Sequence, residues 1–139
     1  MTGYTIDQLE LGQRADFSKT VTETDVYLFA GISGDFNPAH VNEAYAAQTA
    51  FKTRIAHGML SAGFISNVLG NRLPGPGTIY ISQSLTFLAP VRIGDTITAT
   101  AEVVEIMKEK KRVRIKTVCT NQAGDEILTG EALVSPPRG

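Results

Sequence analysis

The chain has 139 residues and a mass of 14.9 kDa, and 42% of its residues are apolar, so one compact domain spanning residues 1–139 is expected. Its 14 acidic and 13 basic residues nearly cancel, which argues against an electrostatic grip on nucleic acid or an anionic membrane. The sequence shows no run of 18 apolar residues and no basic, apolar leader, so we expect a cytoplasmic protein without a membrane anchor.

The first half of the chain, up to about Leu73, is rich in small and helix-forming residues and predicts three helical pieces. Thr22 and Asp25 resemble a capping box, in which two side chains satisfy free backbone N–H groups at a helix start. Asn42 is a good N-cap for the second piece. The third piece is apolar around most of its circumference, so other elements are expected to wrap it. The predicted helices run from Thr22 to a stop at Gly31 and Gly34, from Glu43 to Gln48, and from Gly58 to Leu69.

The second half is rich in β-branched residues and predicts an antiparallel sheet with one solvated face. In the third segment Val113, Ile115 and Val118 lie near one phase and basic residues on the other. The fold class expected is therefore α+β, with a strongly curved antiparallel sheet wrapped around one central apolar helix. A domain this small leaves a sheet edge that needs cover, which favours a homodimer. The predicted strands span Thr78 to Phe87, Asp95 to Ile106, Arg112 to Asn121 and Glu126 to Val134, with a hairpin loop at residues 121–125.

Residues able to transfer protons gather in one segment, Ser33 to His40, between the first two predicted helices. Asp35 and His40 are five residues apart with a proline between them, so a turn can bring both side chains to one small volume. A carboxylate and an imidazole aimed at one point can hold a water, one removing its proton while the other delivers a proton to a substrate. The spacing alone also suits a plainer alternative, in which Asp35 caps a turn and His40 is a hydrogen-bonded loop residue.

A second informative pair, His57 and Gly58, lies at the expected start of the central helix, where free N–H groups and the positive end of the helix dipole meet. Gly58 would let a substrate carbonyl approach the backbone closely, so that its oxygen could carry negative charge. His57 is expected to be a structural residue that fixes the loop. Ser66 is a polar residue in the apolar helix, and its ordinary role would be a bond to a carbonyl one turn earlier.

Other chemistries lack their residues in this sequence. One cysteine and two histidines cannot supply the usual zinc ligand sets, so no metal centre is predicted. The phosphate-binding glycine motif is absent as well. Cys119 lies in a strand-like run and is expected to be a buried structural thiol.

Together these residues resemble the MaoC-like hydratase family, and most of all its single-domain (R)-specific enoyl-CoA hydratases. The family's hydratase motif is matched by GDFNPAHVNEAYAAQTAF (residues 34–51), with the motif's aspartate and histidine at Asp35 and His40. The helix-start motif and central helix are matched by RIAHGMLSAGFISNVLG (54–70). The strand and turn that follow are matched by LPGPGTIYISQSLTFLAPVRIGDTI (73–97), so the resemblance covers nearly the whole chain.

The resemblance implies a hot-dog fold, assembled as a homodimer with the acyl pocket at the subunit interface. It implies reversible syn addition of water to a trans-2-enoyl-CoA, giving an (R)-3-hydroxyacyl-CoA, with no cofactor beyond the CoA thioester substrate. Asp35 and His40 would hold and activate the water and protonate the α-carbon, with the division of these steps left open. The amide N–H of Gly58 would bind the thioester oxygen. Site-lining roles are implied for the polar residues Asn37 and Ser66, and contact with the acyl chain for Leu69 and Leu133.

Three alternatives share much of this pattern. A carrier-protein dehydratase would run the same chemistry on an acyl-carrier-protein thioester. A hot-dog thioesterase would direct the water at the carbonyl and release a thiol, but it has no need for a group that protonates an α-carbon. A non-catalytic acyl-thioester-binding module would tolerate alanine at Asp35 or His40.

Overall fold

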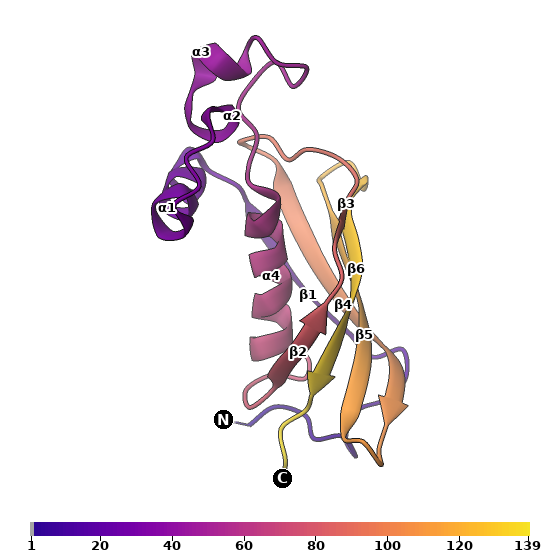
Figure 1. Cartoon of the computed structure of the whole chain (residues 1–139). Helices are drawn as coiled ribbons and strands as arrows, with labels where there is room; N and C mark the ends of the chain where they lie inside the picture. The colour runs from indigo at the N-terminus through magenta and orange to yellow at the C-terminus, as the bar shows by residue number, and fades with distance from the viewer. Residues whose placement is uncertain (1) are drawn as a thin grey trace.

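The computed structural model describes residues 2–139, which form one antiparallel sheet and a set of helices on one side of it (Figure 1). The strands are β1 (Arg14–Thr20), β2 (Ile79–Gln83), β3 (Thr86–Phe87), β4 (Thr96–Met107), β5 (Arg112–Thr120) and β6 (Glu126–Ser135). The helices are α1 (Glu23–Ser33), α2 (Pro38–Val41), α3 (Glu43–Ala46) and α4 (Gly58–Asn71). The sheet order is β1-β4-β5-β6-β2, and β3 pairs with β6 beside this path.

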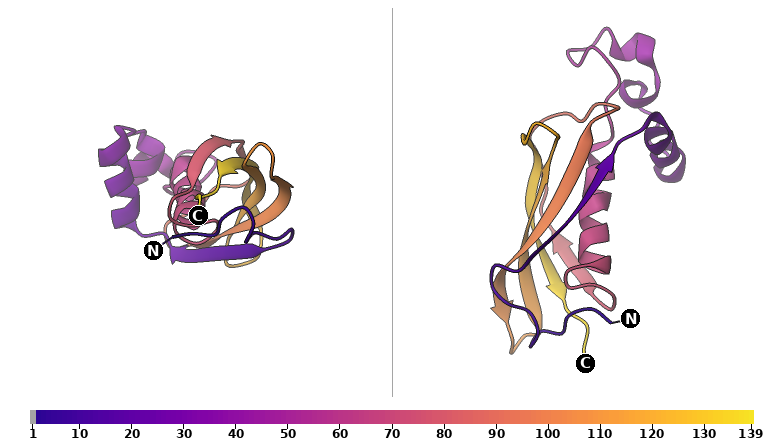
Figure 2. Two further views of the ribbon diagram at one scale, coloured as in Figure 1. Left: turned by 90° about the horizontal axis from the view of Figure 1, so that it is seen from below. Right: turned by 180° about the vertical axis from the view of Figure 1, so that it is seen from behind.

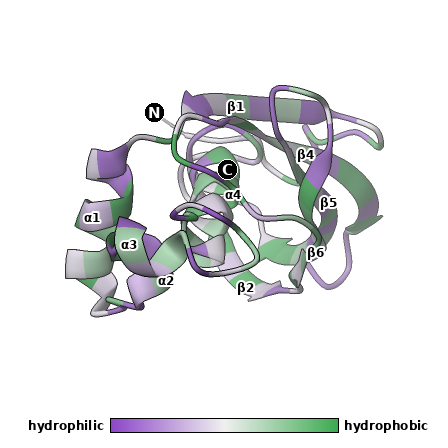
Figure 3. Ribbon diagram, turned by 90° about the horizontal axis from the view of Figure 1, so that it is seen from above, coloured by the Kyte–Doolittle hydropathy of each residue, from purple (hydrophilic) through white to green (hydrophobic). Residues whose placement is uncertain are grey.

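Helix α4 forms the centre of the core, with the sheet curved around it. Viewed along its axis, α4 lies inside the curve of the sheet (Figures 2 and 3). Its buried side chains Phe64, Ile65, Val68 and Leu69 belong to one cluster with apolar residues of β4, β5 and β6. Each fully buried aliphatic side chain stabilises the fold by about 1.5–3 kcal/mol, so this cluster anchors the helix firmly. The predicted sheet wrapped around an apolar helix is confirmed.

Three details of the predicted sheet were wrong. Strand β1 was not predicted, although its alternate residues Ala15 and Phe17 turn inward and Phe17 packs edge-on against Phe64 at 5.8 Å between ring centroids. The predicted strand from Thr78 to Phe87 is broken into β2 and β3. At the break the chain approaches β6 closely: a Cβ at Gly130 would lie 1.8 Å from the carbonyl oxygen of Ser84.

The third error concerns the phase of β5. Thr117, not Val118, is fully buried on the α4 face, in register with Gly130 on β6. Its hydroxyl accepts a hydrogen bond of 2.8 Å from Nε2 of Gln83, which satisfies the buried oxygen. Strict alternation along Val113, Ile115 and Thr117 therefore overrides the apolar character of Val118.

Helices α1, α2 and α3 project beyond the N-terminal end of α4 and lie beside the sheet rather than under it (Figures 1 and 3). Helix α1 begins with the predicted capping box, in which the Asp25 N–H donates to Thr22 and the Thr22 N–H donates to Asp25. It passes through Gly31 and ends at Gly34, whose φ of 81° suits glycine. Helix α3 begins at its predicted cap, Asn42, but is shorter than predicted, and α2 was not predicted.

Cys119 is fully buried on β5, and its Sγ–H donates to the carbonyl oxygen of Ser61 at 3.7 Å. Burial raises the pKa of this thiol to about 12, which keeps it protonated at neutral pH. The prediction of a buried structural thiol is confirmed. Among residues 2–139 no helix combines the length and the apolar character that a membrane crossing requires.

Candidate functional site

Asp35 lies in the turn that links α1 to α2, and the turn is shaped by side-chain bonds to the backbone. The Asn37 N–H donates to Oδ1 of Asp35 at 3.1 Å, and the Ala39 N–H donates to Oδ1 of Asn37 at 3.0 Å. These bonds leave the second oxygen of the exposed Asp35 carboxylate free for other partners. Asn37 caps α2, so its predicted role in lining the substrate site stays a prediction.

His40, on α2, is held in one orientation by the segment that precedes α4. Its Nδ1 lies 2.6 Å from the carbonyl oxygen of Ile55, and the Ile55 N–H donates to the carbonyl of Ala39 at 3.1 Å. Because a carbonyl oxygen can only accept, Nδ1 must carry the proton and Nε2 is the free nitrogen. A neutral His40 in this tautomer is able to take a proton at Nε2.

His57 contacts both Asp35 and His40. Its ring is only 3% exposed, its Nε2–H donates to the backbone carbonyl of Asp35 at 2.9 Å, and it stacks on His40 with ring centroids 3.8 Å apart. The ring of Phe29 packs on it at 4.9 Å. The prediction that His57 fixes the loop is confirmed by these contacts.

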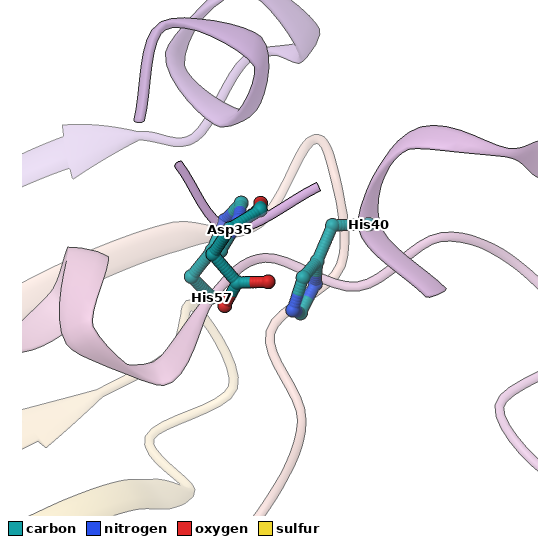
Figure 4. A group of neighbouring side chains, drawn as sticks. All are labelled: Asp35, His40 and His57. Atoms are coloured by element: carbon teal, nitrogen blue, oxygen red, sulfur yellow. The ribbon is translucent and has the colours of Figure 1, made fainter. Parts of the chain in front are cut away.

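Asp35, His40 and His57 form one cluster, with donor atoms within 4.8 Å of one another (Figure 4). The Asp35 carboxylate points toward the His40 ring. The ligand types would also suit a metal ion. The two imidazoles stack at 28° between planes, and Nδ1 of His40 and Nε2 of His57 already face backbone carbonyls. The free Nε2 of His40 and the free carboxylate oxygen of Asp35 can hold a water and transfer protons through it.

The N-terminus of α4 lies beside this cluster. His57 is the N-cap residue but makes no side-chain cap bond, so the first turn of the helix keeps N–H groups free for a ligand. Gly58 is the first helical residue, and a Cβ there would lie 2.5 Å from Cε1 of Phe87. The absence of a side chain at Gly58 therefore lets the Phe87 ring close over the helix start.

Two cavities lie along α4 and share Met59; of the three cluster residues, His40 lines the first, and none lines the second. The first, about 480 Å³, is lined by His40, Gly58, Phe87 and apolar residues of the segments before α4 and after β3. The second, about 500 Å³, lies between α4 and β2 and is lined by Ser66 and Tyr80 among others. The first cavity therefore extends from the imidazole of His40 to the N-terminus of α4.

The structure brings Asp35, His40 and Gly58 together, and Ser66 into the second cavity, but it places the two leucines elsewhere. Leu69 is 1% exposed within the core and lines neither cavity. Leu133 lies in register with Arg114, on the face of β6 turned away from the fully buried Ala132 and Val134. Leu133 lines neither cavity, so the predicted contact of the two leucines with the acyl chain stays a prediction.

Comparison with known proteins gives a consistent picture. Residues 7–126 match the family model described as MaoC like domain. The chain is 62% identical over 131 residues to an (R)-specific enoyl-CoA hydratase of Rhodospirillum rubrum, covering 94% of this chain and 90% of the relative. It is 46% identical to the (R)-specific enoyl-CoA hydratase of Aeromonas caviae, covering 93% and 96% of the two chains.

Solved structures agree with this comparison. Unliganded R-hydratase PhaJ1 from Pseudomonas aeruginosa superposes with a TM-score of 0.95 at 46% identity, covering 99% of this chain and 88% of that one. The A. caviae (R)-hydratase involved in PHA biosynthesis gives a TM-score of 0.91 at 46% identity, covering 93% and 98%. The predicted hot-dog fold is confirmed by these likenesses.

Proposed function

The chain belongs to the family of MaoC-like domains, and we propose that it is an (R)-specific enoyl-CoA hydratase. The reaction is the reversible addition of water to a trans-2-enoyl-CoA, which gives an (R)-3-hydroxyacyl-CoA. The observation that carries the proposal is the convergence of a free Asp35 carboxylate oxygen and the free Nε2 of His40 beside the N-terminus of α4. Water is the only co-reactant, so the chemistry requires no cofactor.

The chemistry follows from this geometry. A water held between Asp35 and His40 loses a proton to one of them as its oxygen bonds to C3 of the enoyl group. The π electrons move toward the thioester oxygen, which gains negative charge beside the N–H of Gly58. The proton taken from the water is then delivered to C2, either by the group that removed it or by the other member of the dyad after the proton has passed to it, and the enolate collapses to the saturated thioester. Because both groups approach from one side, hydrogen and hydroxyl add to the same face.

Two features of the site favour these steps energetically. Ile55 accepts from Nδ1 of His40 at 2.6 Å, so an imidazolium formed at this ring would keep a stabilising partner. The stacked His57 ring and its bond to the Asp35 carbonyl hold the dyad before substrate arrives, which lowers the entropic cost of reaching a reactive geometry.

The proposal is tested with crotonyl-CoA and a longer trans-2-enoyl-CoA, by following the loss of enoyl-thioester absorbance. An (R)-specific 3-hydroxyacyl-CoA dehydrogenase reads the product, and a thiol reagent runs in parallel. Loss of absorbance with (R)-product and no thiol is expected. Thiol release without the alcohol would identify a thioesterase instead. If neither hydration nor thiol release is detected, the result would favour a dehydratase that acts on acyl-carrier-protein thioesters, or a non-catalytic binding module.

Gly58→Ala is expected to lower kcat/KM by about 10- to 100-fold, the cost of a displacement of about 1 Å at a reacting centre. The new methyl would meet the Phe87 ring at 2.5 Å and push it into the first cavity. Steady-state kinetics with crotonyl-CoA measure the loss. The double variant Gly58→Ala/Phe87→Ala should recover part of it, because the obstructing ring is gone. An unchanged rate in the single variant would remove Gly58 from the site.

We also propose that two copies of the chain pair through β2. Strand β2 ends the sheet order and is paired on its other side only to β6, and Ile79 and Ile81 on it are 64% and 41% exposed. The neighbouring Met59 of α4 is 54% exposed and borders the second cavity. A second copy would cover this apolar edge and close that cavity, as soluble domains commonly require.

Light scattering after gel filtration is expected to give a mass near twice the 14.9 kDa of the chain. Ile79→Lys should shift this mass toward one chain, because two lysines would then face each other across the strand pair. Val104→Lys, at an exposed apolar position on β4, is the matched control and should leave the mass unchanged. A monomeric wild-type protein would contradict the pairing.

A further inference from the structure

The three short helices that carry the dyad receive little support from the core. Helix α2 buries no side chain, α3 buries only Ala46, and α1 buries Val26 and Ala30. Helices of four residues are not stable by themselves, because helix nucleation costs more than so few hydrogen bonds return. Something other than apolar burial must therefore fix the positions of Asp35 and His40.

Arg54 makes the contacts that these helices need. Its side chain is only 17% exposed, although it is charged. Its Nη1 lies 2.7 Å from Oε2 of Glu23 on α1, and its Nε lies 2.9 Å from Oε2 of Glu43 on α3. The guanidinium also packs 5.7 Å from the ring centroid of Tyr27 on α1 and donates to its hydroxyl. One side chain thus joins the helix before Asp35 to the helix after His40.

The backbone around Arg54 completes the connection. The Arg54 N–H donates to Glu43 at 3.2 Å, and the next residue, Ile55, holds the Ala39 carbonyl and Nδ1 of His40. A guanidinium in a fork between two carboxylates sets distance and direction, which a lone exposed ion pair does not. Movement of Arg54 would therefore shift His40 directly and α1 through Glu23.

The charges in this cluster support one another. Hydrogen bonds from Thr53 and then from Arg54 hold the pKa of Glu43 below its ordinary value. The hydrogen bond to Glu23 is the main cause that raises the pKa of Arg54 above its ordinary value. Both shifts favour the ionised forms of Glu43 and Arg54, which strengthens the ion pair between them.

We propose that Arg54, through Glu23, Tyr27 and Glu43, is a positioning residue that sets the distance between Asp35 and His40 in the hydration reaction. The inference rests on the proposed function of this site and extends it to residues that touch no substrate. Its consequence is a specific kinetic defect: the dyad is displaced, while the cavity walls formed by α4, by β2 and by the segment after β3 remain in place.

The test compares Arg54→Met with Arg114→Met. Arg114 also bridges two carboxylates, Glu105 at 3.0 Å and Glu131 at 3.1 Å. This residue lies on the sheet and is far in sequence from Asp35 and His40, so it serves as the matched control. Arg54→Met is expected to lower kcat by about 100-fold with KM changed by less than about threefold, since a displacement of about 1 Å carries that cost. Arg54→Lys should recover part of kcat, and Arg114→Met should retain the wild-type kcat. Equal kcat in the two methionine variants would overturn the proposal.

Hydrogen exchange separates this proposal from the proposed function. Backbone amides of residues 33–45 should exchange at least about tenfold faster in Arg54→Met, while those of α4 keep their protection. Unchanged exchange of residues 33–45 in Arg54→Met would overturn the positioning role of Arg54, whatever the activity of the wild-type protein. If exchange of residues 33–45 is faster in Arg54→Met but the wild-type protein hydrates no enoyl-CoA, the positioning role of Arg54 would be upheld and the hydratase assignment overturned. Loss of protection in α4 would show general unfolding and overturn the assignment of a local role.

Discussion

Asp35→Asn should lower the rate of enoyl-CoA hydration by between about 10²- and 10⁴-fold, the range that a positioned acid–base group contributes. The amide keeps an oxygen to accept from the Asn37 N–H, so the turn that shapes the site should persist. What it loses is the negative charge and the capacity to accept a proton from water. Steady-state kinetics with crotonyl-CoA, together with a thermal melt to verify folding, measure the effect.

The matched control is Asp16→Asn, which neutralises an exposed carboxylate on β1. This variant should keep the wild-type rate, because its position is remote from the α1–α2 turn. If Asp35→Asn also kept the wild-type rate while folding normally, the dyad would be wrong and a binding role for the chain would gain support.

His40→Asn is expected to cost a similar factor, at least about 10²-fold, for a different reason. Its amide N–H can replace Nδ1–H toward the Ile55 carbonyl, so α2 should stay docked. No group then replaces Nε2, and proton transfer at that nitrogen ends. A rate near that of the wild type would contradict the assignment of His40.

Isotope exchange can divide the two steps between the residues. When (R)-3-hydroxybutyryl-CoA is incubated with the enzyme in D₂O, the reversible reaction should replace the hydrogen at C2 of the substrate by deuterium. This exchange depends on the residue that transfers the proton at C2. The variant that lacks this group should lose exchange, whereas the variant that lacks the water-activating group should keep more of it. Equal residual exchange in Asp35→Asn and His40→Asn would show that both residues act as a unit, as coupled catalytic groups often do.

Periodicity and capping predicted much of the fold because the elements concerned satisfy their own local rules. Helix α4 is predicted by its nearly continuous apolar surface, and α1 is predicted by the capping pair Thr22 and Asp25. Strand β1 was not predicted because only two of its seven residues, Ala15 and Phe17, are apolar, and only contact with α4 shows that Phe17 turns inward. The break after β2 lies at a close approach of Ser84 to Gly130, which are 46 positions apart in sequence.

The site was predictable where chemistry and spacing coincided, and less so where orientation decides. Asp35, His40 and Gly58 could be named from residue type and resemblance. The tautomer of His40 could not, because it depends on the Ile55 carbonyl 15 residues away. A motif match also does not fix the face on which Leu133 lies, because a shift of one residue along a strand turns a side chain to the other face. Arg54 opens the motif at residues 54–70, but its positioning role could not be predicted, since its partners lie on two other elements, α1 and α3.

The burial of Cys119 provides a built-in reporter of folding. The thiol packs between α4 and the sheet and is held largely protonated, so a disulfide reagent such as DTNB should modify it only after α4 separates from β5. The rate at which the reagent labels Cys119 in dilute denaturant therefore measures how often α4 separates from the sheet, with no engineered probe. The same inertness means that the native enzyme contributes no background colour when free CoA is titrated.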